Sequence, residues 1–260
     1  LDVDLVRDSI TRISAAGALA ADRVSAPVLG APQADDIPEL AELKRALGAF
    51  ALDAPQVRLV SDNAGVELVL LRPLTARPAN GGELQLSSAR APALSMRAGG
   101  AAQGAFSVAS RRGGGLPEAR FDGVQWRMTP GGFAATLKGE AALDFGPARD
   151  IAFSTRGELV STGGRLTYTT DDCIPLTVRK LDLGENSVEA VTGRACPTSN
   201  PLVVVQNGLW RARTRLVDVA ASVPVFEAGL SDAEGELTVD GGPKGVSMRV
   251  GVAKAQVADR

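Results

Sequence analysis

One stretch of the sequence alternates between apolar and mostly polar residues over thirteen positions without a break. Its odd positions are Phe133, Ala135, Leu137, Gly139, Ala141, Leu143 and Phe145. Successive side chains of a β-strand point to opposite faces, so the pattern predicts one long strand with one apolar face. Strands usually have about five or six residues. A strand this long favours a large, curved sheet.

Two later segments have the same two-faced character. In the first, four residues alternate with three arginines: Trp210, Ala212, Thr214 and Leu216 against Arg211, Arg213 and Arg215. In the second, four apolar residues alternate with smaller or polar ones: Val246, Met248, Val250 and Val252 against Ser247, Arg249 and Gly251. The arginines have two interpretations. They form a solvated outer face with cross-strand ion pairs, or they contact anionic head groups or an acidic patch of a partner.

Short turn motifs separate the apolar segments from Val57 onward. The sequence Asp62-Asn63-Ala64-Gly65 lies between the apolar runs Val57–Val60 and Val66–Leu71 and predicts a hairpin. Glycine clusters predict further turns at 80–82, 113–115, 131–132, 163–164 and 241–242. We therefore expect successive antiparallel strands of about 8–13 residues between these turns.

A short helix is predicted at about residues 36–48. Asp36 can cap its N-terminus, and Glu39 completes a capping-box pattern three positions later. The apolar face is formed by Leu40, Leu43 and Leu47, and Gly48 ends the run. We therefore expect an N-terminal region, residues 1–50, followed by an antiparallel β-sheet segment, residues 51–260.

The first thirty residues favour a second helix less clearly. Val6, Ile10 and Ile13 have the spacing of one helix face, but Gly17 is the next position on that face. Glycine weakens a helix by about 1 kcal/mol relative to alanine.

The composition excludes several classes of function. The net charge of −2 argues against a nucleic-acid partner, which needs a basic surface. No apolar run reaches the ~18 residues of a membrane-spanning helix. The aromatic content of 4% means that any core is built mainly from Ala, Val and Leu. The chain begins without Met or a signal peptide, so we expect a mature or an excised segment.

No motif predicts catalysis. The chain has no histidine, which removes Ser-His-Asp and Cys-His mechanisms and most transition-metal sites. The stretch 241–247 contains Gly, Lys and Ser, but not in the spacing of a nucleotide-binding loop. Asp171 and Asp172 are adjacent, so on a strand they point to opposite faces and cannot share a proton. We expect no catalytic residue, metal or cofactor; an enzyme on this chain would have to use carboxylates.

The two cysteines, Cys173 and Cys196, lack the further ligands of a zinc site and the close spacing of a redox pair. We interpret them as a structural disulfide in an oxidising compartment, worth roughly 3 kcal/mol on the chain-entropy model. The alternative is two buried free thiols in a cytosolic protein.

A set of residues around the cysteines carries a family resemblance: Asp172-Cys173-Ile174-Pro175-Leu176, Leu181, Asn186, Cys196-Pro197 and Gly208-Leu209-Trp210. This pattern resembles the YdbH branch of the AsmA-like bacterial proteins, over about residues 50–260. The resemblance implies an elongated, curved antiparallel sheet with a taco-like apolar groove for lipid acyl chains, in a protein anchored in the inner membrane that crosses the periplasm. It implies no catalytic residues.

Together these observations predict a non-enzymatic periplasmic lipid conduit between the inner and outer membranes. The expected groove residues are Phe133, Ala135, Leu137, Ala141, Leu143, Phe145, Val246, Met248 and Val250. The expected partners are phospholipid acyl chains, an inner-membrane anchor outside this segment and, as a further option, a small outer-membrane lipoprotein. The alternative is a structural or adhesive β-sandwich module of a secreted or cell-envelope protein, in which a second sheet covers the apolar face.

Overall fold

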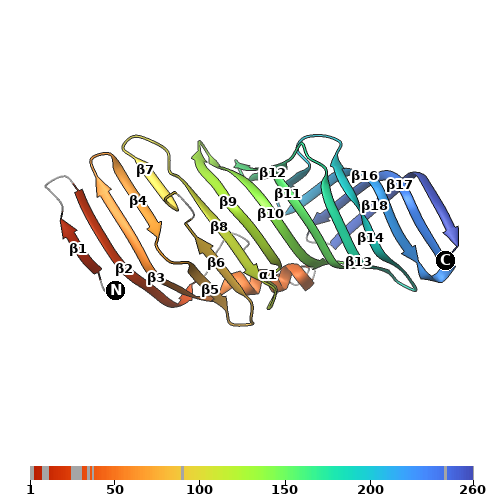
Figure 1. The fold of residues 1–260 in the computed structure, drawn as a ribbon, viewed down its shortest axis with the longest axis horizontal. Helices are drawn as coiled ribbons and strands as arrows, with labels where there is room; N and C mark the ends of the chain where they lie inside the picture. The colour runs from red at the N-terminus through yellow and green to blue at the C-terminus, as the bar shows by residue number, and fades with distance from the viewer. Residues whose placement is uncertain are drawn as a thin grey trace. The chain divides into compact units, whose positions relative to one another are not determined.

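The computed structural model describes residues 3–7, 12–24, 31–33, 36, 38–88, 91–242 and 245–259. The chain divides into two compact units, one formed by Leu1–Pro32 with Glu42–Lys138 and one by Gln33–Ala41 with Gly139–Arg260. The described strands are hydrogen-bonded into one antiparallel sheet, and the described residues contain a single α-helix (Figure 1). The predicted fold class, mainly β and antiparallel with a short helix near the N-terminus, is confirmed.

The first unit consists of short and long strands in chain order. They are β1 (Val3–Arg7), β2 (Arg12–Val24), β3 (Phe50–Asp62), β4 (Gly65–Leu70), β5 (Leu74–Pro78), β6 (Glu83–Ser87), β7 (Leu94–Arg97), β8 (Gln103–Arg111), β9 (Glu118–Thr129) and the first half of β10 (Gly132–Phe145). The expectation of a helix in the first thirty residues is wrong. Val6 and Ile13 lie in the paired strands β1 and β2, while Ile10 lies outside the described residues. The ladder with β3 gives β2 a partner that the local helical spacing did not predict.

The second unit contains the longest strands. They are the second half of β10, β11 (Ala148–Thr162), β12 (Arg165–Thr169), β13 (Ile174–Leu183), β14 (Asn186–Pro197), β15 (Val203–Gln206), β16 (Leu209–Val223), β17 (Ala228–Gly242) and β18 (Gly245–Asp259), with a 3-10 turn η2 (Pro224–Phe226) before β17. Each strand pairs antiparallel with its neighbours, and β18 pairs only with β17 among the described strands.

Helix α1 (Pro38–Gly48) coincides with the predicted helix within two residues at its start. Ala46 is fully buried, and Glu39 in the first turn accepts a hydrogen bond from Arg149 Nη1 at the start of β11 (3.2 Å). Asp36 lies two residues before the helix and accepts the Gln33 N–H (2.7 Å). These contacts fix the first turn of the helix against the second unit.

The same strand topology occurs in both units. In the first unit β3 pairs with β4 along one part of its length and with β5 along the other. We call β4 and β5 together a row, because they occupy one position in the sheet and are separated only by residues 71–73. The next row consists of β6 and β7, and β8 pairs with both. In the second unit β11 takes the place of β3. The interrupted row consists of β12 and β13, the next row consists of β14 and β15, and β16 pairs with both β14 and β15.

The predicted hairpin turns are present, with one exception. Asp62 Oδ1 accepts the N–H groups of Ala64 (2.8 Å) and Gly65 (3.1 Å), and the turn between β3 and β4 forms as expected. Gly241 and Gly242 were expected in a turn, but they are the last two residues of β17. The Trp210 indole lies across Gly241, and the Leu209 side chain lies next to Gly242, so a Cβ atom at either position would clash.

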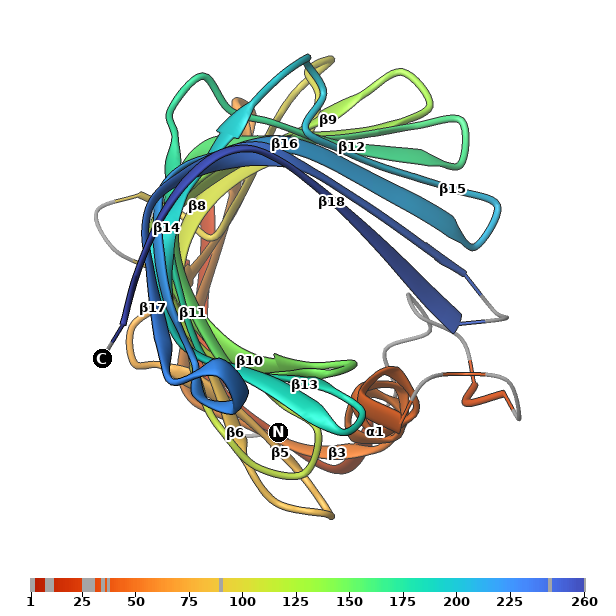
Figure 2. The same cartoon turned by 90° about the vertical axis from the view of Figure 1, so that its right-hand side faces the viewer.

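A line of β-bulges bends the strands of the second unit. Ala190 in β14, Asp218 in β16 and Asp232 in β17 have positive φ values of 51°, 53° and 48°. The strand register shifts by one residue next to each of them. A bulge bends its strand and increases the local twist. Because the bulges lie in neighbouring rows, the bends add up, and Figure 2 shows these strands curving around one side.

Candidate functional site: the inner face of the second unit

One face of the second unit is apolar, and the strand register defines it. Residues directly opposite one another in a sheet lie on the same face. Starting from Trp210, Ala212, Thr214 and Leu216 in β16, the register gives the members in neighbouring rows. They are Gly235, Leu237, Val239 and Gly241; Val246, Met248, Val250 and Val252; Val203 and Val205; Ile174, Leu176, Val178 and Ala195; Ile151, Phe153 and Leu159; and Leu166 and Tyr168. We call this set the inner face. None of these residues is charged; the next position on this face beyond Ile151 and Val178 carries the opposed pair Arg149 and Lys180.

An aromatic contact shows that the inner face is concave. The ring centroids of Phe145 and Trp210 lie 5.6 Å apart. Phe145 ends β10 beside the start of β11, whereas Trp210 begins β16 at the other ends of the strands. In a flat sheet the two opposite ends of the strands would be about 50 Å apart, the length of a fifteen-residue strand. The sheet of the second unit therefore curls so strongly that side chains from opposite ends of its strands touch at this pair.

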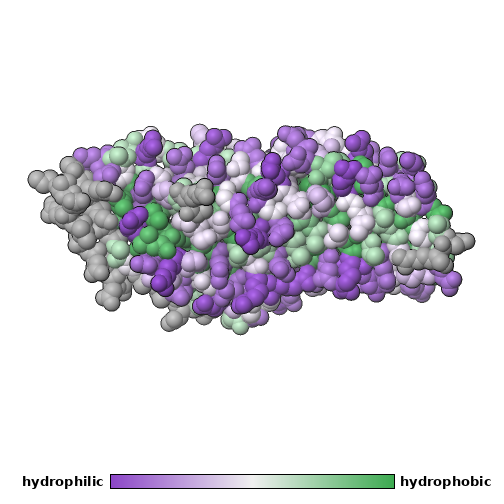
Figure 3. Space-filling model, in the orientation of Figure 1, coloured by the Kyte–Doolittle hydropathy of each residue, from purple (hydrophilic) through white to green (hydrophobic). Residues whose placement is uncertain are grey.

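The inner face is open to solvent along β18. Met248, Val250 and Val252 in β18 are 42%, 49% and 63% exposed. Among the described residues no large side chain is fully buried, and the buried apolar residues are mostly alanines. A second sheet packed on the inner face would have buried these side chains. The arrangement is a single curved layer rather than a filled sandwich. Figure 3 shows hydrophobic side chains at the surface in each unit, among hydrophilic ones.

The opposite, outer face carries three Arg–Asp ion pairs. Arg211 pairs with Asp240 across β16 and β17, Arg194 pairs with Asp218, and Arg179 with Asp150. These side chains are all at least 37% exposed. Arg211 thus makes a cross-strand ion pair on an exposed face, as the first of the two interpretations of the arginine row expects. Two of these carboxylates, Asp150 and Asp218, belong to residues with positive φ.

Glycines let the large aromatic rings lie flat on the sheet. Trp210 is directly opposite Gly241, where a Cβ atom would come within 2.1 Å of the indole ring. A Cβ atom at Gly157 would lie 2.5 Å from the hydroxyl of Tyr168, which also hydrogen-bonds to Thr155. Burial raises the pKa of the Tyr168 phenol, and the hydrogen bond with Thr155 opposes that shift. Rings that lie along the sheet leave the space above it free.

The structure places the predicted groove residues as follows. Those of β18, Val246, Met248 and Val250, belong to the inner face by register. Phe145 joins it through its contact with Trp210. The other five, Phe133, Ala135, Leu137, Ala141 and Leu143, occupy alternate positions of the same continuous strand as Phe145.

The exposure pattern of β10 agrees with a shared face over its middle part. Thr136, Lys138 and Glu140 are exposed, while Leu137 and Ala141 are half-buried. The alternation is interrupted at Ala134, which is 5% exposed although the sequence pattern assigned it to the polar face.

A corresponding apolar face exists in the first unit. It runs through Leu52, Ala54, Leu74, Ala76, Leu84, Leu86, Phe106, Val108, Phe121, Val124 and Trp126. Gly123 provides a bulge in β9 at φ 66°, and Gly104 lies opposite Trp126. The same devices, a bulge and a glycine under an aromatic ring, thus recur.

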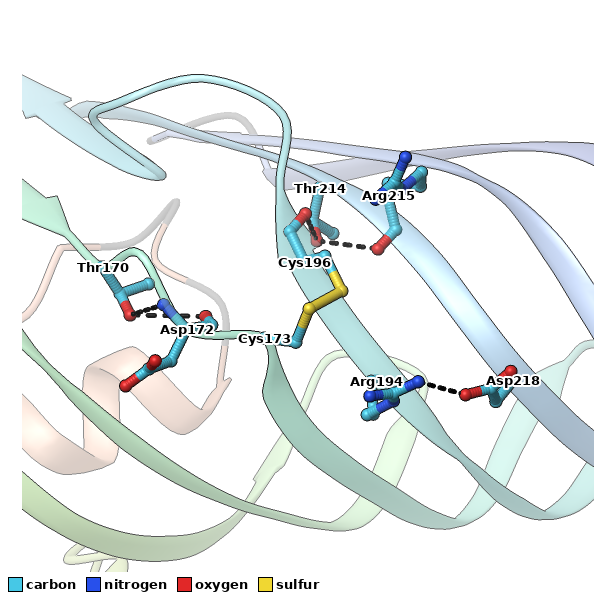
Figure 4. The surroundings of a disulfide bond; sticks show 8 residues. All are labelled: Thr170, Asp172, Cys173, Arg194, Cys196, Thr214, Arg215 and Asp218. Atoms are coloured by element: carbon cyan, nitrogen blue, oxygen red, sulfur yellow. Dashed lines mark hydrogen bonds and ion pairs between the residues drawn. A yellow bond between two sulfur atoms is a disulfide. The ribbon is translucent and has the colours of Figure 1, made fainter.

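Cys173 and Cys196 form the predicted disulfide, with their Cα atoms 4.0 Å apart (Figure 4). They continue the register of β13 and β14, one step beyond Ile174 and Ala195. Cys173 lies at the end of the break between β12 and β13, and Cys196 lies just before the break between β14 and β15, so the bond joins the two interrupted rows. Thr214 Oγ1 donates to the Cys196 carbonyl (2.8 Å) and extends the connection to β16. A disulfide is typical of an oxidising, extracytoplasmic environment.

Hydrogen bonds hold the adjacent acidic residues Asp171 and Asp172 in the loop before β13. Asp171 accepts a hydrogen bond from Asn200 (3.1 Å), and the Asp172 N–H donates to Thr170 Oγ1 (3.1 Å). In the described part of the chain no cluster of three or more potential metal ligands occurs. The pair instead organises the interruption before Cys173.

A pocket of about 750 Å³ lies at one edge of the second unit. It is lined by Val204, Gln206, Asn207, Leu209, Trp210, Arg211, Asp240 and Gly241. Trp210 and Gly241 belong to the inner face, whereas Val204, Arg211 and Asp240 share the outer face. By the same register Gln206 and Leu209 also belong to the outer face, so the pocket lies mainly on that face, at the rim formed by the start of β16.

Sequence reasoning missed part of the inner face. Residues of β11, such as Phe153 and Leu159, alternate in the same way, but Thr155 and Gly157 interrupt their apolar pattern. No helix among the described residues has the length and hydrophobicity to cross a membrane. Comparison of the chain with family models, with curated proteins and with solved structures found no match.

Proposed function

We propose that this chain is a segment of a lipid conduit, in which the concave inner face shields phospholipid acyl chains from water. The observation that carries the proposal is the apolar stretch of the inner face of the second unit, which is open along β18, where Val250 and Val252 are 49% and 63% exposed. Leaving apolar side chains exposed on one continuous face costs stability, and it is typical of a binding surface. The predicted location, the periplasm, and the likeness to AsmA-like proteins belong to the same proposal.

The physical reasoning concerns the acyl chain. Each CH₂ group kept out of water is worth about 0.8 kcal/mol, so a chain of ordinary length needs a long apolar surface. The inner face provides such a surface across neighbouring rows, and the rings of Trp210 and Tyr168 lie against Gly241 and Gly157 of the sheet. The bulges supply the curvature that lets one sheet surround a tail from several sides.

Site-specific crosslinking tests the proposal. A photo-reactive amino acid at Val250 faces the inner side, and one at Arg249, its neighbour in the same strand, faces the outer side. We expect phospholipid adducts by mass spectrometry from the first position only, after expression in a Gram-negative periplasm. Equal adducts at both positions, or none at either, would contradict the conduit. None at either is the outcome that the adhesive sandwich module predicts.

A charged variant gives a second arm. Val252→Asp places a carboxylate on the inner face at a site exposed enough for the fold to survive. A carboxylate beside an acyl chain costs several kcal/mol if it is desolvated. We expect the lipid adduct at Val250 to be lost while the thermal unfolding midpoint changes little. Arg249→Asp is the matched control on the outer side, and it should leave the adduct unchanged.

A further inference from the structure

The rim pocket beside Trp210 combines apolar and charged groups in a way that the inner face does not. Trp210 and Leu209 supply apolar surface, and Arg211 and Asp240 stand close by as an ion pair. A ligand with one part on the inner face and another at this rim would have to be amphipathic. Resting on the proposed function, we infer that the pocket receives the head group of a zwitterionic phospholipid whose tails lie on the inner face.

The charges favour a zwitterion over an anion. The lining residues contain one cation, Arg211, and one anion, Asp240, so the pocket is neutral overall. A head group with a phosphodiester and an ammonium group matches such a pair, with the phosphate toward Arg211 and the ammonium toward Asp240. An anionic head group gains the first interaction but meets the repulsion of Asp240. Gln206 and Asn207 add hydrogen-bonding groups that do not discriminate by charge.

The geometry places head and tail on the correct sides. Arg211 and Asp240 are 55% and 37% exposed on the outer face, where a head group stays in water. Trp210 is the adjacent residue in β16 and turns to the inner face. A lipid that crosses the rim at Trp210 therefore keeps its head beside the ion pair and its tails in the trough.

The test is the head-group selectivity of the whole chain. Protein is equilibrated with vesicles of equal parts phosphatidylethanolamine and phosphatidylglycerol, and the bound lipids are quantified by mass spectrometry. We expect enrichment of phosphatidylethanolamine over the input mixture. Asp240→Asn removes the anion and should shift the bound ratio toward phosphatidylglycerol by about twofold to fivefold, the effect of one exposed ion pair.

A matched control separates the pocket from general electrostatics. Asp218→Asn removes the same charge from another Arg–Asp pair on the outer face, and asparagine tolerates the positive φ there. This variant should keep the wild-type ratio. The inference is overturned if wild type binds both lipids in the input ratio, or if both variants shift the ratio equally. Absence of any bound lipid would overturn the proposed function as well, so the two failures are distinguishable.

Discussion

Individual glycines decide where the largest side chains of this protein lie. At Gly241 and Gly157 the missing Cβ leaves the space that Trp210 and Tyr168 occupy along the sheet. The same glycines would be weak choices for a strand on propensity alone. These glycines therefore contribute to stability by leaving room for the ring on the neighbouring strand, and not through their own strand propensity.

Gly241→Ala should destabilise the second unit by about 1–3 kcal/mol, the usual cost of overpacking. The new Cβ would lie 2.1 Å from a ring carbon of Trp210, so the indole has to leave its position. Urea unfolding and the tryptophan emission maximum measure the two effects. Gly251→Ala is the matched control in the adjacent strand, where a Cβ meets nothing within 4 Å. Equal effects of both substitutions would contradict the explanation.

Tyr168, the only tyrosine, should ionise above its ordinary pKa of about 10 in the folded protein, because burial disfavours the phenolate. The contribution of the neutral phenol to folding stability is fully present below the pKa of the unfolded state, and it is lost as the pH rises through the pKa of the folded state. Absorbance titration at an ultraviolet wavelength specific for tyrosinate measures this directly. A native midpoint equal to that in denaturant would contradict it. Thr155→Val, which removes the hydrogen bond that opposes the shift, should raise the midpoint further.

At the scale of strands, the sequence predicts the elements better than their bends. The alternation of β10 and the turn at Asp62 follow from side-chain period and turn chemistry, both of which are local. The bulges at Ala190 and Asp218 do not, because no residue type marks them and the positive φ is imposed by register with neighbouring strands. The interrupted rows were missed for the same reason. The candidate site was therefore predicted as alternating positions of a curved sheet, while the bulges that bend its strands were not.

Ala190 tests the bulge without disturbing an ion pair. A left-handed conformation costs a non-glycine residue about 1–2 kcal/mol, so Ala190→Gly should be neutral or stabilising. Ala190→Val should destabilise by a similar amount, because a β-branched side chain tolerates positive φ poorly. Denaturant unfolding of both variants gives the comparison. If glycine destabilises more than valine does, the positive φ is not what the position requires.

The disulfide joins two interrupted rows, and its loss should lower stability by roughly 3 kcal/mol. The double variant Cys173→Ser with Cys196→Ser should show this loss in urea unfolding, and a reductant should then have no further effect on it. In the first unit the corresponding tie is a hydrogen bond from the Leu70 N–H to Ser88 Oγ (3.0 Å). Ser88→Ala provides the comparison and should cost about 1 kcal/mol. A reductant that leaves wild-type stability unchanged would contradict the role of the bond.

At the scale of the whole molecule, each row is stabilised mainly by the rows beside it. Such a quasi-one-dimensional arrangement makes stability a sum of neighbour terms and leaves the terminal rows weakest. In the second unit β17 and β18 have fifteen residues each, but β18 has a paired neighbour on one side only. We expect faster amide hydrogen exchange in 245–259 than in 228–242, measured by mass spectrometry of peptides. Equal protection of the two strands would indicate a partner on the edge of β18.

The row order also has a mechanical consequence. Tension applied to the two ends of an antiparallel meander separates one row at a time, so each step opposes only the hydrogen bonds of a single row. The Cys173–Cys196 bond stops this stepwise separation, because the chain between the two cysteines, which are 23 positions apart, remains a closed loop under tension. About 80 Å of chain, at roughly 3.5 Å per residue, is thereby withheld from extension. The second unit thus contains a segment that cannot be drawn out, at the place where its rows are interrupted.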